Sequence, residues 1–267
     1  MRSPLAALGT LACAVSYGVM LAPIALVVWI SFARDAILTI PPTGYTLAWY
    51  GEAWGNADFM NGLLLSLEVA VMASLGGVAL GVAAAAALVR YPFRGHAWVS
   101  QFLLAPILVP GIVAGLAIYL FYLRAQDTLD VDVLGTHWSL VLAHLCLTVP
   151  WTVRLVAASL EGLDLSLEEA ARNLGARRLT VFTRIVLPLL KPALISAALF
   201  GFIVSFENLE VSLPLVGAGQ TTLPIAILHH LEYRIDPTIA AVSTVQIVLL
   251  GFAMVLTDRF VKQNRIL

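Results

Sequence analysis

Hydrophobic residues run along this chain in six long stretches, at roughly 9–33, 62–89, 97–123, 137–160, 189–213 and 239–257. A helix needs about 20 largely apolar residues to cross the hydrocarbon core of a bilayer, and each stretch is about that long. Backbone polar groups in lipid have to be paired inside the helix itself. The pattern therefore predicts an all-α, polytopic membrane protein with six transmembrane helices in a single transmembrane domain over residues 1–267.

Composition supports the same class. Hydrophobic residues make up 60% of the chain and charged residues only 12%, whereas soluble domains are about 25% charged. A soluble enzyme, a secreted protein and a nucleic-acid-binding protein are all poor interpretations. The two cysteines, Cys13 and Cys146, lie far apart in apolar stretches, so neither a disulfide framework nor a zinc site is indicated. The first stretch is about 25 residues long, which favours a retained helix over a cleaved signal peptide.

Basic residues fall mainly on one side of the predicted spans. If the N-terminus is cytoplasmic, eleven of the 15 Lys and Arg residues lie in inner segments, and Arg154 lies inside the fourth span. Only Arg34, Arg124 and Arg234 then lie in outer segments. Cytoplasmic segments of membrane proteins are enriched in Lys and Arg, so the sequence predicts that both termini are cytoplasmic.

The chain shows no catalytic constellation. It lacks a G-x-x-x-x-G-K-[ST] phosphate loop, an H-E-x-x-H motif and a G-x-S-x-G motif. His229 and His230 are adjacent and point about 100° apart on a helix, which makes a poor metal pair. We expect His137 to be a rim residue and His144 to be a packed, hydrogen-bonding residue. Gly76, Gly77 and Gly81 crowd the second span, which predicts close helix packing.

The longest inner segment, residues 161–188, has the pattern of two short amphipathic helices. Ser166 followed by Glu169 is a capping box, which predicts a helix start. Gly175 predicts the helix end, because glycine readily adopts the positive φ of a C′ position. The apolar stripe of the first helix is predicted to be Leu163, Leu167, Ala170, Ala171 and Leu174. The second helix is predicted to place Leu179, Phe182, Ile185 and Val186 on one face. The small Ala170 and Ala171 favour docking against protein over immersion in lipid.

This loop resembles one in a known family. Glu169-Ala170-Ala171, then Gly175, Ile185 and Leu187-Pro188, match without gaps the EAA loop of binding-protein-dependent ATP-binding-cassette (ABC) importer permeases. The resemblance covers nearly the whole chain and implies a six-helix bundle of the type I importer, MetI-like kind. It also implies that the loop, at about 161–188, is a coupling element that enters a cleft of an ATPase subunit. The residues expected to couple are Glu168, Glu169, Ala170, Ala171, Leu174, Gly175, Ala176 and Arg177.

The resemblance also implies the partners. These are a second permease subunit that is a different chain, two ATPase subunits, a periplasmic or extracellular substrate-binding protein, and the lipid bilayer, with no nucleic acid. ATP and Mg²⁺ would bind to the ATPase, so this chain is expected to hold no cofactor or metal and to catalyse no reaction. The expected location is the bacterial inner (plasma) membrane.

Further stretches resemble the spermidine/putrescine-type branch of the family. They include Leu47-Ala48-Trp49-Tyr50, Ser205-Phe206-Glu207-Asn208 and Asp236-Pro237, where Asp236 would be the N-cap of the last helix. The resemblance implies a polyamine or another small organic cation as substrate. An acidic pair is common in that branch where Glu207-Asn208 stands here, so this chain departs from the pattern. Permeases for a phosphonate, ferric iron or another small solute are the alternatives.

Several charged residues fall at membrane depth, where a charge costs at least ~2.5 kcal/mol on insertion scales. Glu207 and Glu210 are three residues apart and would share a helix face. Together with Asn208 and Glu68, they are the candidate residues of a substrate path. The alternative is that the carboxylates pair with a partner subunit or with Arg154 to hold the assembly together. We expect Arg154 to extend towards the interface instead.

Two other classes of function are disfavoured. A secondary transporter or channel that works alone would be expected to show an internal repeat, and the six stretches show none. A membrane-embedded hydrolase would need Ser/His or Asp dyads, which the sequence lacks. An importer permease driven by a separate ATPase is therefore the favoured interpretation.

Overall fold

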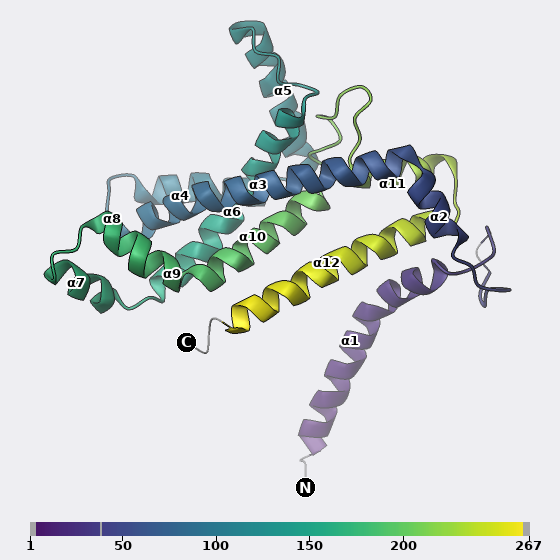
Figure 1. The fold of residues 1–267 in the computed structure, drawn as a ribbon, viewed down its shortest axis with the longest axis horizontal. Helices are drawn as coiled ribbons and strands as arrows, with labels where there is room; N and C mark the ends of the chain where they lie inside the picture. The colour runs from purple at the N-terminus through teal and green to yellow at the C-terminus, as the bar shows by residue number, and fades with distance from the viewer. Residues whose placement is uncertain (1–3, 38, 264–267) are drawn as a thin grey trace. The chain divides into compact units, whose positions relative to one another are not determined.

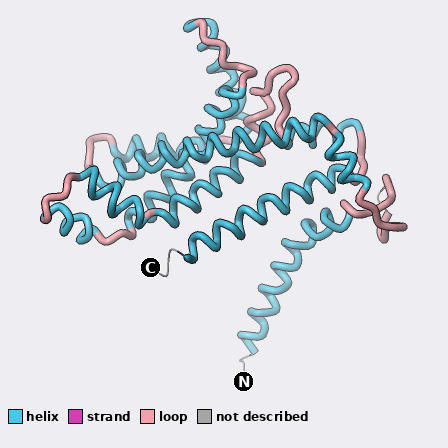
Figure 2. The backbone as a smooth tube through the Cα atoms, viewed as in Figure 1, coloured by secondary structure: helices cyan, strands magenta, loops and turns pink. Residues whose placement is uncertain are grey.

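The computed structural model describes residues 4–37 and 39–263, and these form helices joined by loops (Figure 1; Figure 2). Among the described residues no strand forms, and one isolated bridge joins Ala33 and Tyr45. The all-α prediction is confirmed. The elements are α1 (Pro4–Ile30), α2 (Ala48–Gly55), α3 (Ala57–Arg90), α4 (His96–Leu104), η1 (Ala105–Leu108), α5 (Gly111–Leu129), α6 (His137–Glu161), α7 (Leu165–Asn173), α8 (Arg178–Val181), the π-helix η2 (Phe182–Val186), α9 (Leu187–Leu189), α10 (Lys191–Phe206), α11 (Leu223–Tyr233) and α12 (Thr238–Gln263).

Four of these helices are long and apolar enough to cross a membrane: α1 over Gly9–Ile30, α3, α6, and α12 over Thr238–Val261. Two pairs of shorter helical segments meet the same criterion only when each pair is taken together, and each is bent at a short break. The described part of the chain therefore provides up to six membrane spans, if each bent pair counts as one.

The third predicted span, 97–123, was wrong as one continuous helix. His96–Leu108 and Gly111–Leu129 meet at an angle of 111°. Pro110 explains the break, because a residue before proline is pushed out of the helical region. Val109 accordingly has an extended backbone, with φ −85° and ψ 130°.

The fifth predicted span, 189–213, starts within two residues of α10 but was wrong at its far end. Arg178–Leu189 meets Lys191–Phe206 at 69°, and Pro192 in the first turn of α10 lacks the N–H that would continue the preceding helix. At the other end, the Asn208 side chain accepts a hydrogen bond from the Val211 N–H at 2.9 Å. The Ser212 hydroxyl donates to the Asn208 carbonyl at 2.7 Å. Such local side-chain bonds compete with a helix, and α10 ends at Phe206.

The chain divides into two compact units. One comprises the described residues of Met1–Met60 together with Ala226–Leu249, and the other comprises Asn61–Ile225 with the described residues of Leu250–Leu267. In the first unit, Trp49 Nε1 donates to the Ala33 carbonyl at 2.7 Å, which fastens α2 to the loop after α1. The apolar window of α1 has 0% of its residues buried within the structure.

The start of α12 also lies in the first unit. The Asp236 carboxylate accepts a hydrogen bond from the Thr238 N–H at 3.0 Å and lies 3.3 Å from Nε2 of His230. This confirms Asp236 as a capping residue at the start of the last helix. The ring of His230 also lies against that of Phe59, with the ring centroids 5.2 Å apart.

In the second unit, α3, α6 and α10 run side by side (Figure 1). The Thr148 hydroxyl on α6 donates to the Ala73 carbonyl on α3 at 2.9 Å, and the Ser74 hydroxyl on α3 donates to the Ala198 carbonyl on α10 at 2.6 Å. A Cβ at Gly77 would lie 2.4 Å from Oγ1 of Thr148. The glycines of the second span therefore allow close helix approach, as predicted.

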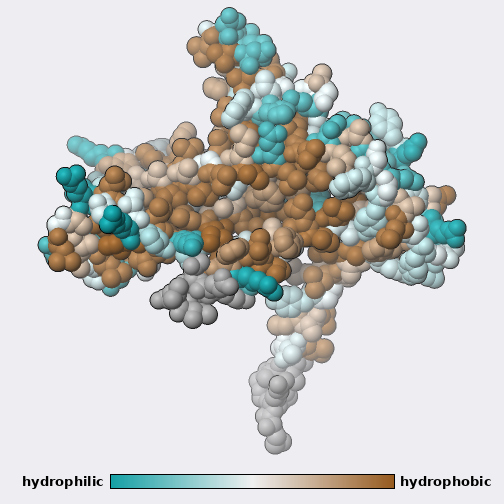
Figure 3. Space-filling model, viewed as in Figure 1, coloured by the Kyte–Doolittle hydropathy of each residue, from teal (hydrophilic) through white to brown (hydrophobic). Residues whose placement is uncertain are grey.

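Two apolar clusters fill the second unit. One joins α3 and α6 to the segment after α10, and the other joins them to the helices around the 161–188 loop. The buried members are Leu65, Val69, Tyr122, Leu140, Val141, Ala143, Val211 and Leu215 in the first, and Val82, Ala85, Val156, Leu160, Val181, Val186, Leu190 and Ala197 in the second. Other side chains of α3 are exposed, among them Leu64, Val71, Leu75 and Leu80. Figure 3 shows that hydrophobic residues cover much of the visible face of the molecule, as expected for helices that cross a lipid bilayer.

Candidate functional site

The first helix of the 161–188 loop, α7, has defined ends. At its start, the Asp164 carboxylate accepts a hydrogen bond from the Ser166 N–H at 2.9 Å. Asp164 is therefore the N-cap, and the predicted capping box from Ser166 to Glu169 was wrong. Ser166 already lies inside α7, because the Asp164 carboxylate caps the Ser166 N–H and the helix begins directly after Asp164. The backbone N–H and the hydroxyl of Ser166 together hold the pKa of Asp164 below its usual value.

At its other end, α7 stops in a Schellman motif. Gly175 has φ +86°, a conformation that side chains with a Cβ resist. The Gly175 N–H donates to the Arg172 carbonyl at 2.9 Å, and the Ala176 N–H donates to the Ala171 carbonyl at 3.1 Å. These two bonds satisfy carbonyls that a helix end leaves open. The prediction that Gly175 ends the helix is confirmed.

The apolar stripe of α7 is divided between the interior and the solvent. Leu163, Ala171 and Ala176 pack against the second apolar cluster. Leu174 is 89% exposed and Leu167 is 48% exposed. Helix α7 buries no residue of its own, so a row of apolar side chains stays available at the tip of the loop.

The second half of the loop differs from the prediction in register. Leu179 is 73% exposed, while Val181 is buried and Val186 is buried. Leu179 was therefore placed wrongly on the packed face that contains Phe182, Ile185 and Val186. Ile185 and Val186 lie in the π-helix η2 (Phe182–Val186), whose wider turn changes their register relative to Leu179 from that of an α-helix.

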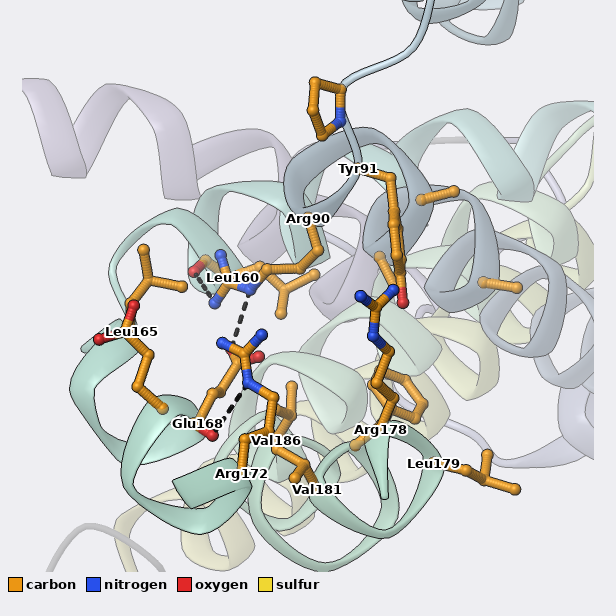
Figure 4. Close-up of a pocket in the computed structure, with 16 residues that line it drawn as sticks. Arg90, Tyr91, Leu160, Leu165, Glu168, Arg172, Arg178, Leu179, Val181 and Val186 are labelled. Atoms are coloured by element: carbon orange, nitrogen blue, oxygen red, sulfur yellow. Dashed lines mark hydrogen bonds and ion pairs between the residues drawn. The ribbon is translucent and has the colours of Figure 1, made fainter. Parts of the chain in front are cut away.

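A cavity of about 740 Å³ opens between the end of α3, the end of α6, and helices α7 and α8 (Figure 4). Nε of Arg90 lies 2.9 Å from Oε1 of Glu168. Arg178 lies over the ring of Tyr91, 6.0 Å from its centroid. Arg172 Nε donates to the Glu168 carbonyl at 3.3 Å. Glu168, one of the expected coupling residues, thus turns inward to an arginine.

Of the other expected coupling residues, Ala171 and Ala176 are partly buried against the second apolar cluster, and the rest are exposed. Glu169 lines the cavity beside Arg90 and Arg172. Ala170 is exposed, and Arg177 is exposed at the start of α8. The loop therefore brings together all eight residues that the sequence indicated. Their coupling role remains a prediction.

The candidate path residues lie where α10 ends. Glu207 is the C-cap of α10, with φ −91° and ψ 2°, and residues 207–216 form the break that follows. Both Glu207 and Glu210 are exposed. They lie beyond the last helical residue, so the prediction that they share a helix face was wrong. In the described part of the chain, neither forms an ion pair with Arg154, which instead lies 5.9 Å from the ring centroid of Trp151.

The break packs closely against the start of α5. A Cβ built on Gly111 would collide with the Glu210 side chain, and a Cβ on Gly115 would lie 2.9 Å from the Glu210 carbonyl. Glycine at both positions lets the backbone of the break and α5 approach each other. Elsewhere in the unit, Glu68 Oε1 on α3 lies 3.6 Å from Nδ1 of His137, and both side chains are about half exposed. Asn208 turns its side chain back onto the break.

His144 is the buried polar centre of the second unit. Its Nδ1 lies 2.7 Å from the Ser205 hydroxyl, and its Nε2 lies 3.1 Å from the Ser212 hydroxyl. The Ser212 hydroxyl donates to the Asn208 carbonyl and so accepts a hydrogen bond from Nε2 of His144. The prediction of a packed, hydrogen-bonding histidine is confirmed, and the contact fixes the break to α6.

Two residues escaped the sequence analysis. Asp164 was passed over although it directly precedes the helix, and an acidic residue at that place is a recognisable N-cap signal. Arg90 was counted only as an inner basic charge. Its partner Glu168 is 78 residues away, and no spacing rule connects the two. No group of three His, Cys, Asp or Glu side chains that could hold a metal ion occurs in residues 4–37 and 39–263.

Comparisons with known proteins point to one class. The family model for the binding-protein-dependent transport system inner membrane component matches residues 77–265. The putrescine transport system permease protein PotI of Escherichia coli is 32% identical over 224 residues, which are 84% of this chain and 79% of PotI. The spermidine/putrescine transport system permease protein PotC of Haemophilus influenzae is 29% identical over 250 residues, 94% of this chain and 95% of PotC.

A solved structure shares the fold. A chain of a bacterial ABC transporter involved in the import of the acidic polysaccharide alginate superposes with a TM-score of 0.73 at 18% identity, and the match covers 97% of this chain and 99% of that chain. The likeness extends over both bent pairs of helices, so the breaks at Pro110 and before α10 lie within a fold that such transporters use.

Proposed function

We propose that this chain, which belongs to the family of binding-protein-dependent transport system inner membrane components, takes part in the import of a polyamine. It is a permease subunit of an ABC importer, a transport protein of the inner membrane and not an enzyme. In the proposed complex it forms half of the substrate path. A different permease chain forms the other half, and two ATPase subunits and a substrate-binding protein complete the assembly.

The proposed route of coupling runs through the 161–188 loop. The observation that supports it best is the tip of α7, where the Gly175 turn presents Leu174 at 89% exposure. A bulky apolar side chain so exposed in a charged loop suits insertion into a protein cleft. ATP and Mg²⁺ are held by the ATPase subunits in this proposal, and this chain transmits their movement to the spans.

The proposed substrate class rests on two supports. PotI is named as a putrescine permease and PotC as a spermidine/putrescine permease. In addition, the exposed carboxylates of Glu207 and Glu210 stand at the break after α10, where ammonium groups of a polyamine would meet opposite charges. Other small organic cations fit the same chemistry. A phosphonate is an anion and would be repelled by these carboxylates. Ferric iron is a cation that carboxylates also attract, so the names of PotI and PotC, and not the carboxylates, favour a polyamine over iron.

The proposed orientation places both termini and the 161–188 loop in the cytoplasm. The excess of Lys and Arg in the segments on that side supports it. This orientation puts α7 and α8 on the face where ATPase subunits bind, and it puts α2 and the turn between α11 and α12 on the face of the substrate-binding protein.

The decisive experiment is reconstitution. The chain would be co-expressed with its neighbouring permease and ATPase, purified as a complex, and placed in proteoliposomes with the substrate-binding protein. We expect ATP-dependent uptake of radiolabelled putrescine or spermidine, competed by the unlabelled polyamine and not by a phosphonate or ferric citrate. Uptake by this chain alone, without an ATPase, would overturn the proposal in favour of a stand-alone transporter.

A further inference from the structure

One guanidinium joins three elements at the end of α3. Nε of Arg90 donates to Oε1 of Glu168 on α7 at 2.9 Å, and its Nη2 donates to the carbonyl of Leu160 near the end of α6, also at 2.9 Å. Figure 4 shows Arg90 between Leu160 and Glu168 at the wall of the 740 Å³ cavity. A fork of donors with fixed geometry can hold two acceptors at once, which an ammonium group does less well.

Helix α7 has few other attachments. It buries none of its residues. Within the residues that the structure describes, the Arg90 contact is the only side-chain hydrogen bond that links α7 to a membrane-spanning helix. The two side chains of the pair are each 16% exposed, so solvent screens the attraction much less than at an open surface. The position of α7 therefore depends strongly on this pair.

Helix α3 continues from Arg90 to the candidate path. Residues 68 and 90 are 22 positions apart on one helix, which corresponds to about 33 Å at 1.5 Å per residue. Glu68, near the other end, is one of the candidate path residues. A movement of α7 that pulls on Arg90 would thus be passed along a continuous rigid element to the region of Glu68.

We infer that Arg90 is a positioning residue that clamps α7 to α3 and α6 through Glu168 and the Leu160 carbonyl, so that movement of α7 is transmitted to the spans. The inference rests on the proposed function and deepens it. The inference gives two neighbouring glutamates different roles. Glu168 pairs with Arg90 inside this chain, and Glu169 remains available to contact the ATPase. Arg90 touches neither substrate nor ATPase in this assignment.

The test uses the complete reconstituted complex. Arg90→Ala, Glu168→Ala and the double variant are compared for substrate transported per ATP hydrolysed, for basal ATP hydrolysis, and for the amount of assembled complex. We expect each single variant to lower the transport-to-ATP ratio about tenfold, within the usual range of coupling between sites. Basal hydrolysis and complex yield should stay near wild type. The double variant should be no worse than the worse single variant, because the two residues form one device.

Conservative and control variants sharpen the test. Arg90→Lys keeps the charge but loses the fork, so it should recover part of the ratio lost in Arg90→Ala. Arg94→Ala and Glu161→Gln remove charges of each sign from exposed positions on the same side and should leave the ratio unchanged. The inference is overturned if the losses of the two single variants multiply in the double variant, or if Arg90→Ala lowers complex yield while the ratio per complex stays at the wild-type value.

A failure of the clamp can be told apart from a failure of the proposed function. If Gly175→Ala abolishes coupling while Arg90→Ala and Glu168→Ala leave it intact, the loop couples but the clamp does not act, and the inference is wrong. If all loop variants, including Glu169→Ala, retain normal coupling, the coupling role proposed for the 161–188 loop is wrong. The inference about Arg90, which rests on that role, is then wrong as well.

Discussion

The Ser205 hydroxyl in the last turn of α10 lies 2.7 Å from Nδ1 of His144 on α6, immediately before the break that holds Glu207. His144 is 2% exposed, so removal of the ring would leave the buried Ser205 hydroxyl without this partner, whereas the Ser212 hydroxyl would keep its bond to the Asn208 carbonyl. The network therefore fixes the end of α10 and the break relative to α6.

We predict that His144→Ala destabilises the permease. An unsatisfied buried polar group costs about 1–3 kcal/mol, and the variant leaves the Ser205 hydroxyl without its partner and also creates a cavity. The purified complex should lose its folded permease at a temperature several degrees lower, as measured by scanning fluorimetry. His137→Ala on the same helix is the control, because its side chain is 53% exposed and the loss should be small. Equal losses in the two variants would contradict the role of the buried network.

The contact between Gly77 and Thr148 yields a second prediction. Gly77→Ala places a Cβ 2.4 Å from Oγ1 of Thr148, so α3 and α6 have to move apart or Thr148 has to give up its bond to Ala73. Overpacking of this kind costs about 1–3 kcal/mol, and the yield of folded permease in the membrane should fall. Gly251→Ala meets nothing within 4 Å and should leave the yield unchanged. A normal yield and melting temperature in Gly77→Ala would show that the two helices are less closely packed than described.

The capping of α7 should depend on pH in one direction. The Asp164 pKa is lowered by hydrogen bonds from Ser166, so the folded helix prefers the ionised carboxylate. The cap is fully present above the unfolded pKa of about 3.9 and is lost as pH falls through the lower folded value. Amide exchange in α7, corrected for intrinsic rates, should stay constant from pH 8 to 5 and accelerate below about pH 4.

Asp164→Asn is the matched control for the cap. Asparagine caps a helix about as well as aspartate and does not titrate, so α7 should keep its protection at low pH in this variant. If wild type and Asp164→Asn lose protection together, the acid effect comes from elsewhere in the loop and the cap is not its cause.

The helices that the sequence predicted best are those with uninterrupted apolar runs. The predicted spans 62–89 and 137–160 agree with α3 and α6 to within a few residues, because in these two stretches the apolar run and the helix have nearly the same ends. The bend at Pro110 was missed, although the proline is visible, because a hydropathy window averages over a residue that lacks an N–H. Hydropathy detects burial in lipid and not the direction of the backbone.

In the candidate site, too, features that depend on neighbouring residues could be predicted, and contacts between residues far apart in the sequence could not. Gly175 could be predicted because the geometry of a helix end depends on the few residues next to it. The contact between Arg90 and Glu168 could not, since it depends on how α3, α6 and α7 pack. The shared face of Glu207 and Glu210 failed because side chains of Asn208 and Ser212 take over backbone bonding, and spacing alone does not show where a helix ends.

Gly175 provides a prediction for coupling. Gly175→Ala forces a Cβ into a φ of +86°, which costs about 1–2 kcal/mol, and the turn that presents Leu174 should be displaced. The complex should assemble normally but lose ATP hydrolysis stimulated by the loaded binding protein, and Glu169→Ala should do the same. Gly162→Ala, at an ordinary φ of −81°, is the control in the same loop. Normal stimulation in both Gly175→Ala and Glu169→Ala would remove the coupling role from this loop.

The last prediction concerns the charge of Glu207. Opposite charges near 4 Å attract by about 4 kcal/mol at an effective dielectric of 20, but a carboxylate exposed at the break stays partly hydrated, so the net gain for a cationic substrate should be on the order of 1–2 kcal/mol. Glu207→Gln keeps the shape and removes the charge. We expect polyamine uptake per assembled complex to fall about tenfold, while the affinity of the separate binding protein for the polyamine stays unchanged. Glu210→Gln should have a smaller effect, because Glu210 also packs against Gly111, and the exposed Glu232→Gln on α11 should have none. If Glu207 serves only assembly, the variant will instead yield little complex but transport at the wild-type rate per complex, and the inference of a cationic substrate then loses its support within this chain.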